Sequence, residues 1–136
     1  RGRASAANIV PASTGAASAI GKVLPSLEGK MEGTAMRVPV ITGSVIDLVL
    51  KLKKNTTVEE INNAFKNSVN ETLGYTTDPI VSSDTIGMYY GGLVDSLLTS
   101  INEVDGEQLV KVVAWYDNEM SYTAQMVRVA RYFSNL

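Results

Sequence analysis

The sequence predicts an α+β fold, in which a mostly antiparallel sheet carries helices on one face. Segments rich in Val and Ile that alternate with polar residues lie between segments with apolar residues at helical spacing. An Asp-Gly pair at 105–106 separates two apolar runs, as in a hairpin turn. With 136 residues, of which 45% are apolar and 19% charged, the chain fits one globular domain.

The first third of the chain predicts one helix and two strands. Ser13 or Thr14 is placed to cap a helix that ends near Val23 or Leu24, because Pro25 cannot lie deep inside a helix. Two alternating stretches, residues 34–40 and 44–51, then predict strands.

The next segment contains the clearest helix signal. Residues 57–60 read Thr-Val-Glu-Glu, which is a capping box, and the apolar face that follows predicts a helix that continues to Gly74. The opposite face, which includes Asn62 and Asn63, is expected to be solvated and structural only. Residues 79–84 predict a short strand, and the Gly-containing segment 87–92 predicts an irregular loop that could line a site.

The last third predicts a hairpin and a helix. Residues 93–101 and 107–115 are expected to be antiparallel neighbours. Apolar residues at helical spacing then predict a C-terminal helix that docks on an apolar surface. This stripe consists of Tyr122, Met126, Val129 and Phe133.

Composition excludes several kinds of chemistry within these residues. The sequence has no Cys and no His, so it offers no disulfide, thiolate or Ser-His triad, and a metal site would need carboxylates and carbonyls. A net charge of -2 gives no basic stripe for nucleic acid or an anionic membrane. No apolar run spans a bilayer and no secretory signal is visible. Arg1 in place of Met leads us to expect that a preceding segment is missing.

Two candidate anion-binding features lie in the first third. Thr14 and Gly15 precede a helix, where free N–H groups and the helix dipole favour phosphate, although small residues there also serve as ordinary caps. Arg37 lies in an otherwise apolar strand, so its side chain either reaches solvent or grips a phosphate or carboxylate in a cleft.

The third candidate is the junction at residues 115–122, where an apolar run meets the C-terminal helix. Polar residues here would lie beside the unsatisfied N–H groups of the new helix. Asp117 or Asn118 could therefore only cap the helix, or the junction could present a site.

Four segments taken together resemble the phosphorylating glyceraldehyde-3-phosphate dehydrogenases. They are Arg1-Gly2-Arg3-Ala4, the run Asn-Ile-Val-Pro-Ala-Ser-Thr-Gly-Ala-Ala at 8–17, Arg37-Val38-Pro39, and Trp-Tyr-Asp-Asn-Glu at 115–119 followed by Tyr122. Their order and spacing match along essentially the whole chain. The resemblance implies that residues 1–136 form the later part of the catalytic domain, without the N-terminal NAD-binding domain and the segment that carries the catalytic Cys and His.

The resemblance also implies roles for individual residues. Thr14 and Gly15 would hold the inorganic phosphate, Arg37 would grip the C3 phosphate of the substrate, and Arg1 would lie between these two anion sites. Asn118 would bind the nicotinamide carboxamide of NAD, and Tyr122 would pack near that ring. No catalytic residue would lie in this chain.

The parent enzyme would be a cytoplasmic, glycolytic oxidoreductase and a homotetramer. With NAD, glyceraldehyde 3-phosphate and inorganic phosphate, it would form 1,3-bisphosphoglycerate through hydride transfer and phosphorolysis of a thioester. The C-terminal helix would lie at the interface with the cofactor domain. A different interpretation is a stand-alone, noncatalytic α+β binding or structural module, which the absence of Cys and His favours if no second polypeptide is present.

Overall fold

The computed structural model describes residues 4–136, which form two compact units that meet in sequence between Ile41 and Thr42. The predicted α+β class is confirmed, because the described residues contain three α-helices and two sheets. Pairing is antiparallel except between β4 and β5. Within residues 4–136, no helix is both long and apolar enough to cross a bilayer.

The first unit is a two-stranded sheet with a helix in its connection. Its elements are η1 (Ser5–Ala7), β1 (Val10–Ser13), α1 (Ala16–Val23), η2 (Pro25–Leu27) and β2 (Thr34–Arg37). The predicted helix is confirmed, and Pro25 begins a separate 3-10 turn where α1 ends. The predicted strand at 34–40 is confirmed in position but ends at Arg37, two residues before Pro39, which has no N–H group to donate to a ladder.

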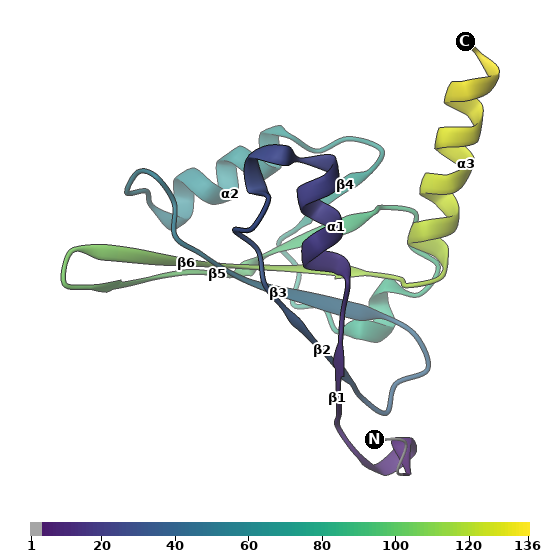
Figure 1. Cartoon of the computed structure of the whole chain (residues 1–136), viewed down its shortest axis with the longest axis horizontal. Coiled ribbons are helices and arrows are strands. Elements are labelled where there is room, and N and C mark those ends of the chain that lie inside the picture. Colours follow the sequence, from purple (N-terminus) through teal and green to yellow (C-terminus); the bar gives the residue numbers. More distant parts are fainter. Residues whose placement is uncertain (1–3) are drawn as a thin grey trace. The chain divides into compact units, whose positions relative to one another are not determined.

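The second unit is a four-stranded sheet with the order β3-β6-β5-β4 (Figure 1). Its elements are β3 (Ser44–Leu50), α2 (Val58–Asn67), β4 (Leu73–Thr76), η3 (Ser82–Thr85), β5 (Gly92–Val104), β6 (Glu107–Tyr116) and α3 (Met120–Ser134). The predicted hairpin is confirmed, and Asp105 and Gly106 turn it with φ angles of 53° and 77°. Both values lie in the region that Asp-Gly turns favour.

The core of the second unit lies between α2 and one face of the sheet. Ile61 of α2 packs with Val94 of β5 and with Val110 and Val112 of β6. Partly buried side chains surround this cluster: Leu48, Leu50, Phe65, Leu73, Tyr75 and Ile101. Burial of this apolar face, rather than helix propensity alone, therefore holds α2 on the sheet.

The helix α2 is shorter than predicted, because it ends at Asn67 and not near Gly74. Ser68 turns its hydroxyl back to the carbonyl of Ala64. Asn70 Oδ1 then accepts hydrogen bonds from the backbone N–H groups of Thr72 and Leu73, at 2.7 and 3.0 Å. Such side-chain bonds satisfy the backbone outside a helix, so the chain leaves the helix early and forms β4.

Residues 79–84 do not form the predicted strand. Asp84 accepts a hydrogen bond from the Val81 N–H at 2.7 Å, and the Thr85 hydroxyl donates to the Ser82 carbonyl at 2.8 Å. These local bonds close the 3-10 turn η3, with Thr85 fully buried. Short-range polar pairing has therefore outweighed the β preference of Ile80 and Val81.

The expectation that Asn62 is a solvated surface residue is wrong. Its side chain is partly buried, and Nδ2 donates to the Ser96 carbonyl of β5 at 3.2 Å. Asn62 thus helps to attach α2 to the sheet.

Candidate functional site

The candidate site is the junction between β6 and α3, built around the carboxylate of Asp117. The ladder between β3 and β6 ends with the pair Ser44 and Tyr116, so the next residues, Gly43 and Asp117, lie close together. Asp117 is buried, with only 3% of its surface exposed. A buried carboxylate needs several hydrogen-bond donors, and the surrounding backbone supplies them.

Three backbone amides and one hydroxyl donate to Asp117. Its Oδ2 accepts from the Gly87 N–H at 2.7 Å, and its Oδ1 accepts from the N–H groups of Glu119 and Met120 at 2.9 and 3.1 Å. The Thr42 hydroxyl lies 3.2 Å from Oδ1. The Gly87 N–H is the largest cause that lowers the pKa of Asp117, followed by the Glu119 N–H, and these donors outweigh the opposing effect of burial.

Asp117 therefore caps α3, since it satisfies N–H groups at the start of that helix. The capping interpretation is confirmed for Asp117. It is not the role of Asn118, whose side chain turns to other partners.

Asn118 presents an amide whose oxygen and nitrogen face different surroundings. Its Oδ1 accepts from the Thr42 hydroxyl at 2.9 Å and from the Gly43 N–H at 3.1 Å. Its Nδ2 has one long contact, 3.4 Å to Glu119 Oε1. The residue is exposed, so the NH2 group remains available as a donor to a ligand.

Tyr122 lies in the first turn of α3 and its side chain is 70% exposed. The hydrogen-bonding chain that runs from Asp117 through Ser121 fixes this turn. The Asp117 N–H donates to the Ser121 hydroxyl at 3.0 Å, and Ser121 is itself buried. The exposed ring of Tyr122 is thus carried by an anchored helix start.

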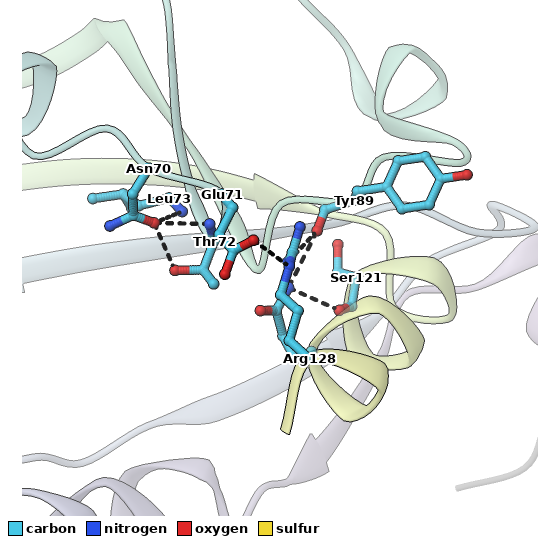
Figure 2. A network of polar contacts seen from close by, with 8 residues as sticks. Asn70, Glu71, Thr72, Leu73, Tyr89, Ser121 and Arg128 are labelled. Carbon is cyan, nitrogen blue, oxygen red and sulfur yellow. Dashed lines mark hydrogen bonds and ion pairs between the residues drawn. The ribbon is translucent and has the colours of Figure 1, made fainter. Parts of the chain in front are cut away.

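The Gly-containing loop 87–92 is attached to α3, as Figure 2 shows around Tyr89. The Tyr89 carbonyl accepts from Gln125 Nε2 at 3.2 Å and from Arg128 Nη1 at 3.0 Å. Arg128 Nε also lies 3.6 Å from a carboxylate oxygen of Glu71 (Figure 2). Gly87 of the same loop is bound to Asp117, so the loop is attached at two residues, Tyr89 to α3 and Gly87 to Asp117. The loop predicted at 87–92 therefore lies beside the junction.

In the first unit, Thr14 and Gly15 lie at the start of α1. Gly15 occupies the N-cap position, and the Thr14 hydroxyl accepts from the Ala16 N–H at 3.2 Å. Thr14 and Gly15 are both exposed. The first-turn amides of a helix have no acceptor within the helix, so this end can bind an anion.

The structure separates Arg37 from Thr14. Arg37 pairs with Val10 at one end of the β1–β2 ladder, whereas Ser13, next to Thr14, pairs with Thr34 at the other end. Three residues of strand span about 10 Å, so Arg37 and Thr14 lie at two separate positions and not in one cluster. Arg37 is exposed. Arg1 lies outside the described residues.

Sequence reasoning missed Thr42 and Gly43, which hold the Asn118 side chain. Gly43 has a φ of 91°, and a Cβ atom there would lie 2.5 Å from the Ser82 carbonyl oxygen. A glycine just before a predicted strand was the only local signal. Among residues 4–136, no group of three or more metal-binding side chains occurs.

Residues 1–118 match the family model described as glyceraldehyde 3-phosphate dehydrogenase, C-terminal domain. The chain belongs to this family. The glyceraldehyde-3-phosphate dehydrogenase of Streptococcus pyogenes is 62% identical to it over all 136 residues. Those of Streptococcus dysgalactiae subsp. equisimilis and Clostridium pasteurianum are 62% and 60% identical over the same length. The chain spans about 40% of the length of these relatives.

Proposed function

We propose that this chain is the C-terminal portion of a glycolytic glyceraldehyde-3-phosphate dehydrogenase that acts in the cytoplasm. The parent enzyme would convert glyceraldehyde 3-phosphate, inorganic phosphate and NAD to 1,3-bisphosphoglycerate and NADH. The observation that carries the proposal is identity of 62% to such a dehydrogenase over the whole chain, together with the family match to residues 1–118.

The junction at Asp117 suits a nicotinamide carboxamide. The exposed NH2 group of Asn118 can donate to the carboxamide oxygen, and Tyr122 offers an exposed ring for packing nearby. NAD, when bound, supplies the hydride acceptor. Residues of this chain would orient its ring, and the anchored start of α3 would keep that orientation fixed.

The first unit suits two phosphate groups. The Arg37 guanidinium would bind the phosphate of the substrate, and the start of α1 at Thr14 and Gly15 would bind inorganic phosphate. Arg1 would lie between them. The separation of the two positions along the β1–β2 ladder supports this division of roles.

The remaining groups would come from another part of the parent protein. Because the sequence holds neither Cys nor His, the nucleophile and the base lie elsewhere in this proposal. The apolar stripe of α3 is exposed in the structure, with Tyr122 and Phe133 70% and 67% exposed. We propose that a cofactor-binding domain covers this stripe and that the complete enzyme is a homotetramer.

The test uses the complete polypeptide that contains these residues and follows NADH formation. Replacing Asn118 by Ala should raise the KM for NAD by roughly five- to tenfold, since one hydrogen bond to the cofactor is lost. The control is Asn63→Ala, because Asn63 is exposed on α2, far along the chain from the junction. Equal kinetics for Asn118→Ala and the wild type would argue against the nicotinamide contact.

The stand-alone binding module is the second candidate, and the absence of Cys and His favours it if no second polypeptide is present. An intact mass of the native protein under denaturing conditions separates the two. A longer chain, or an accompanying fragment, supports the enzyme. A single species of 14.6 kDa that shows no turnover supports the noncatalytic module.

A further inference from the structure

We propose that Thr42 is a positioning residue that acts through Asn118. Its hydroxyl, together with the backbone N–H of Gly43, fixes the Asn118 amide so that the NH2 group faces outward. This inference rests on the proposed function, in which Asn118 binds the carboxamide of the cofactor.

The orientation of the Asn118 amide follows from the Gly43 N–H. A backbone N–H can only donate, and it lies 3.1 Å from Asn118 Oδ1. In the flipped orientation, the NH2 group would face this N–H and two donors would meet. The hydrogen-bond network therefore determines which end of the amide points inward.

Both acceptor positions of Asn118 Oδ1 are used. An amide oxygen has two lone pairs, and here one faces the Gly43 N–H and the other the Thr42 hydroxyl at 2.9 Å. The Asn118 side chain is thus left to act as a donor. A ligand group at this position must be an acceptor, such as the oxygen of a carboxamide.

Gly43 is held in place independently of Asn118. Its φ of 91° is in the region that favours glycine, and Ser82 packs against the position that a Cβ would occupy. The backbone donor is therefore fixed, and the side chain of Thr42 is the part of this pair that a substitution can remove.

The Thr42 hydroxyl also connects Asn118 to Asp117. Its single proton is shared between Asn118 Oδ1 and Asp117 Oδ1, at 2.9 and 3.2 Å. Asp117 keeps three backbone donors without Thr42, whereas Asn118 keeps one. Loss of the hydroxyl should therefore free the Asn118 amide more than it disturbs the cap of α3.

The test compares Thr42→Val, which keeps the shape of the side chain, with Thr42→Ser, which keeps the hydroxyl. In the complete polypeptide, Thr42→Val should raise the KM for NAD by roughly three- to tenfold, the effect of about one neutral hydrogen bond. Thr42→Ser should restore a value near that of the wild type. The KM for glyceraldehyde 3-phosphate should stay unchanged in both.

A double-mutant cycle separates positioning from general structural damage. On an Asn118→Ala background, Thr42→Val should have no further effect on the KM for NAD, because the group that it positions is gone. Thr42→Ala serves as a second variant without the hydroxyl if Thr42→Val unfolds. A penalty that persists in the Asn118→Ala background would overturn the positioning role.

Failure of this inference and failure of the proposed function give different results. If Asn118→Ala raises the KM for NAD but Thr42→Val and Thr42→Ala do not, the positioning role is wrong and the nicotinamide contact stands. If Asn118→Ala itself leaves the KM unchanged, the contact is wrong and the role of Thr42 falls with it.

Discussion

The backbone N–H of Gly87 donates to Asp117 Oδ2 at 2.7 Å and joins two residues that are 30 positions apart. The bond ties the loop 87–92 to the start of α3, because Asp117 also accepts from the first amides of that helix. The buried carboxylate of Asp117, the residue before Asn118, therefore holds the loop 87–92 and the start of α3 together.

The stability of the protein should depend on the charge of Asp117. Its pKa is lowered in the folded state from an ordinary value of 3.8, so the charged form stabilises the fold at neutral pH. This contribution is fully present above the ordinary pKa and is lost as the pH falls below about 4, towards the folded pKa. Asp117→Asn should lower the free energy of unfolding by about 2–4 kcal/mol at pH 7, measured by urea unfolding.

With Asp117→Asn, the free energy of unfolding should fall less steeply than in the wild type as the pH is lowered below about 4. Asp78→Asn is a suitable control, because Asp78 is exposed and its replacement should change stability by less than about 0.5 kcal/mol. If Asp117→Asn and Asp78→Asn gave identical curves between pH 7 and pH 3, the stabilising role of the Asp117 charge would be wrong.

Gly43 and Gly87 offer a matched pair for separating backbone strain from steric clash. Both have positive φ, 91° and 82°, but a Cβ at Gly43 would lie 2.5 Å from the Ser82 carbonyl oxygen, whereas nothing lies within 4 Å at Gly87. Gly87→Ala should lower the free energy of unfolding by about 1 kcal/mol, and Gly43→Ala should lower it by about 2–4 kcal/mol. Thermal or urea unfolding of both variants measures the difference, and equal losses would show that the contact with Ser82 can relax.

Local signals in the sequence predicted the elements whose hydrogen bonds close within a few residues. The capping box of α2 and the Asp105-Gly106 turn of the hairpin are examples, because the partners in each lie within four positions. Two predicted elements are wrong although their bonds are equally short-range, namely the end of α2 and the strand at 79–84. Asn70 and Asp84 form these bonds, but polar residues in such patterns fit several kinds of turn, so the sequence alone does not specify which turn forms.

Long-range contacts could not be predicted in this way. Asn62 finds its partner Ser96 34 positions away, and Asn118 finds Thr42 76 positions away. Each depends on strand register, which one sequence does not specify residue by residue. Asn118 and Tyr122 were predicted as site residues from a family resemblance, and the hydrogen bonds that orient Asn118 emerged only from the pairing of β3 with β6.

The capping box at the start of α2 should contribute to stability through Thr57. The Thr57 hydroxyl accepts from the Glu60 N–H at 3.1 Å, and Glu60 Oε2 accepts from the Thr57 N–H at 2.9 Å. Thr57→Ala should therefore cost about 1 kcal/mol in urea unfolding, whereas Thr57→Ser should be close to neutral. The prediction is wrong if the two replacements have the same effect.

Arg128 should contribute more to the stability of the fold than Glu71, its ion-pair partner. Its side chain is 23% exposed and donates to the Tyr89 carbonyl, whereas Glu71 is 74% exposed and lies 3.6 Å away. Arg128→Met, which keeps much of the stem, should cost about 1–2 kcal/mol, and Glu71→Gln less than about 0.5 kcal/mol. A larger loss for Glu71→Gln in urea unfolding would show that the ion pair, and not the bond to Tyr89, attaches the loop to α3.

Replacement of Arg37 by Leu tests the proposed substrate phosphate position. Arg37 is exposed at the end of β2, so the change should leave the fold intact while it removes a planar donor group for phosphate. In the complete enzyme, the KM for glyceraldehyde 3-phosphate should rise by about tenfold or more, because hydrogen bonds to a charged group are lost. The KM of Arg37→Lys should lie between those of the wild type and Arg37→Leu, since an ammonium group keeps the positive charge but not the two parallel donors of the guanidinium.

The control for this prediction is Lys53→Leu. It removes an exposed charge from a loop of the second unit and should leave the KM for glyceraldehyde 3-phosphate unchanged. An unchanged KM in Arg37→Leu would remove the phosphate role from Arg37, whereas an equal rise in Lys53→Leu would indicate that net charge alone attracts the substrate.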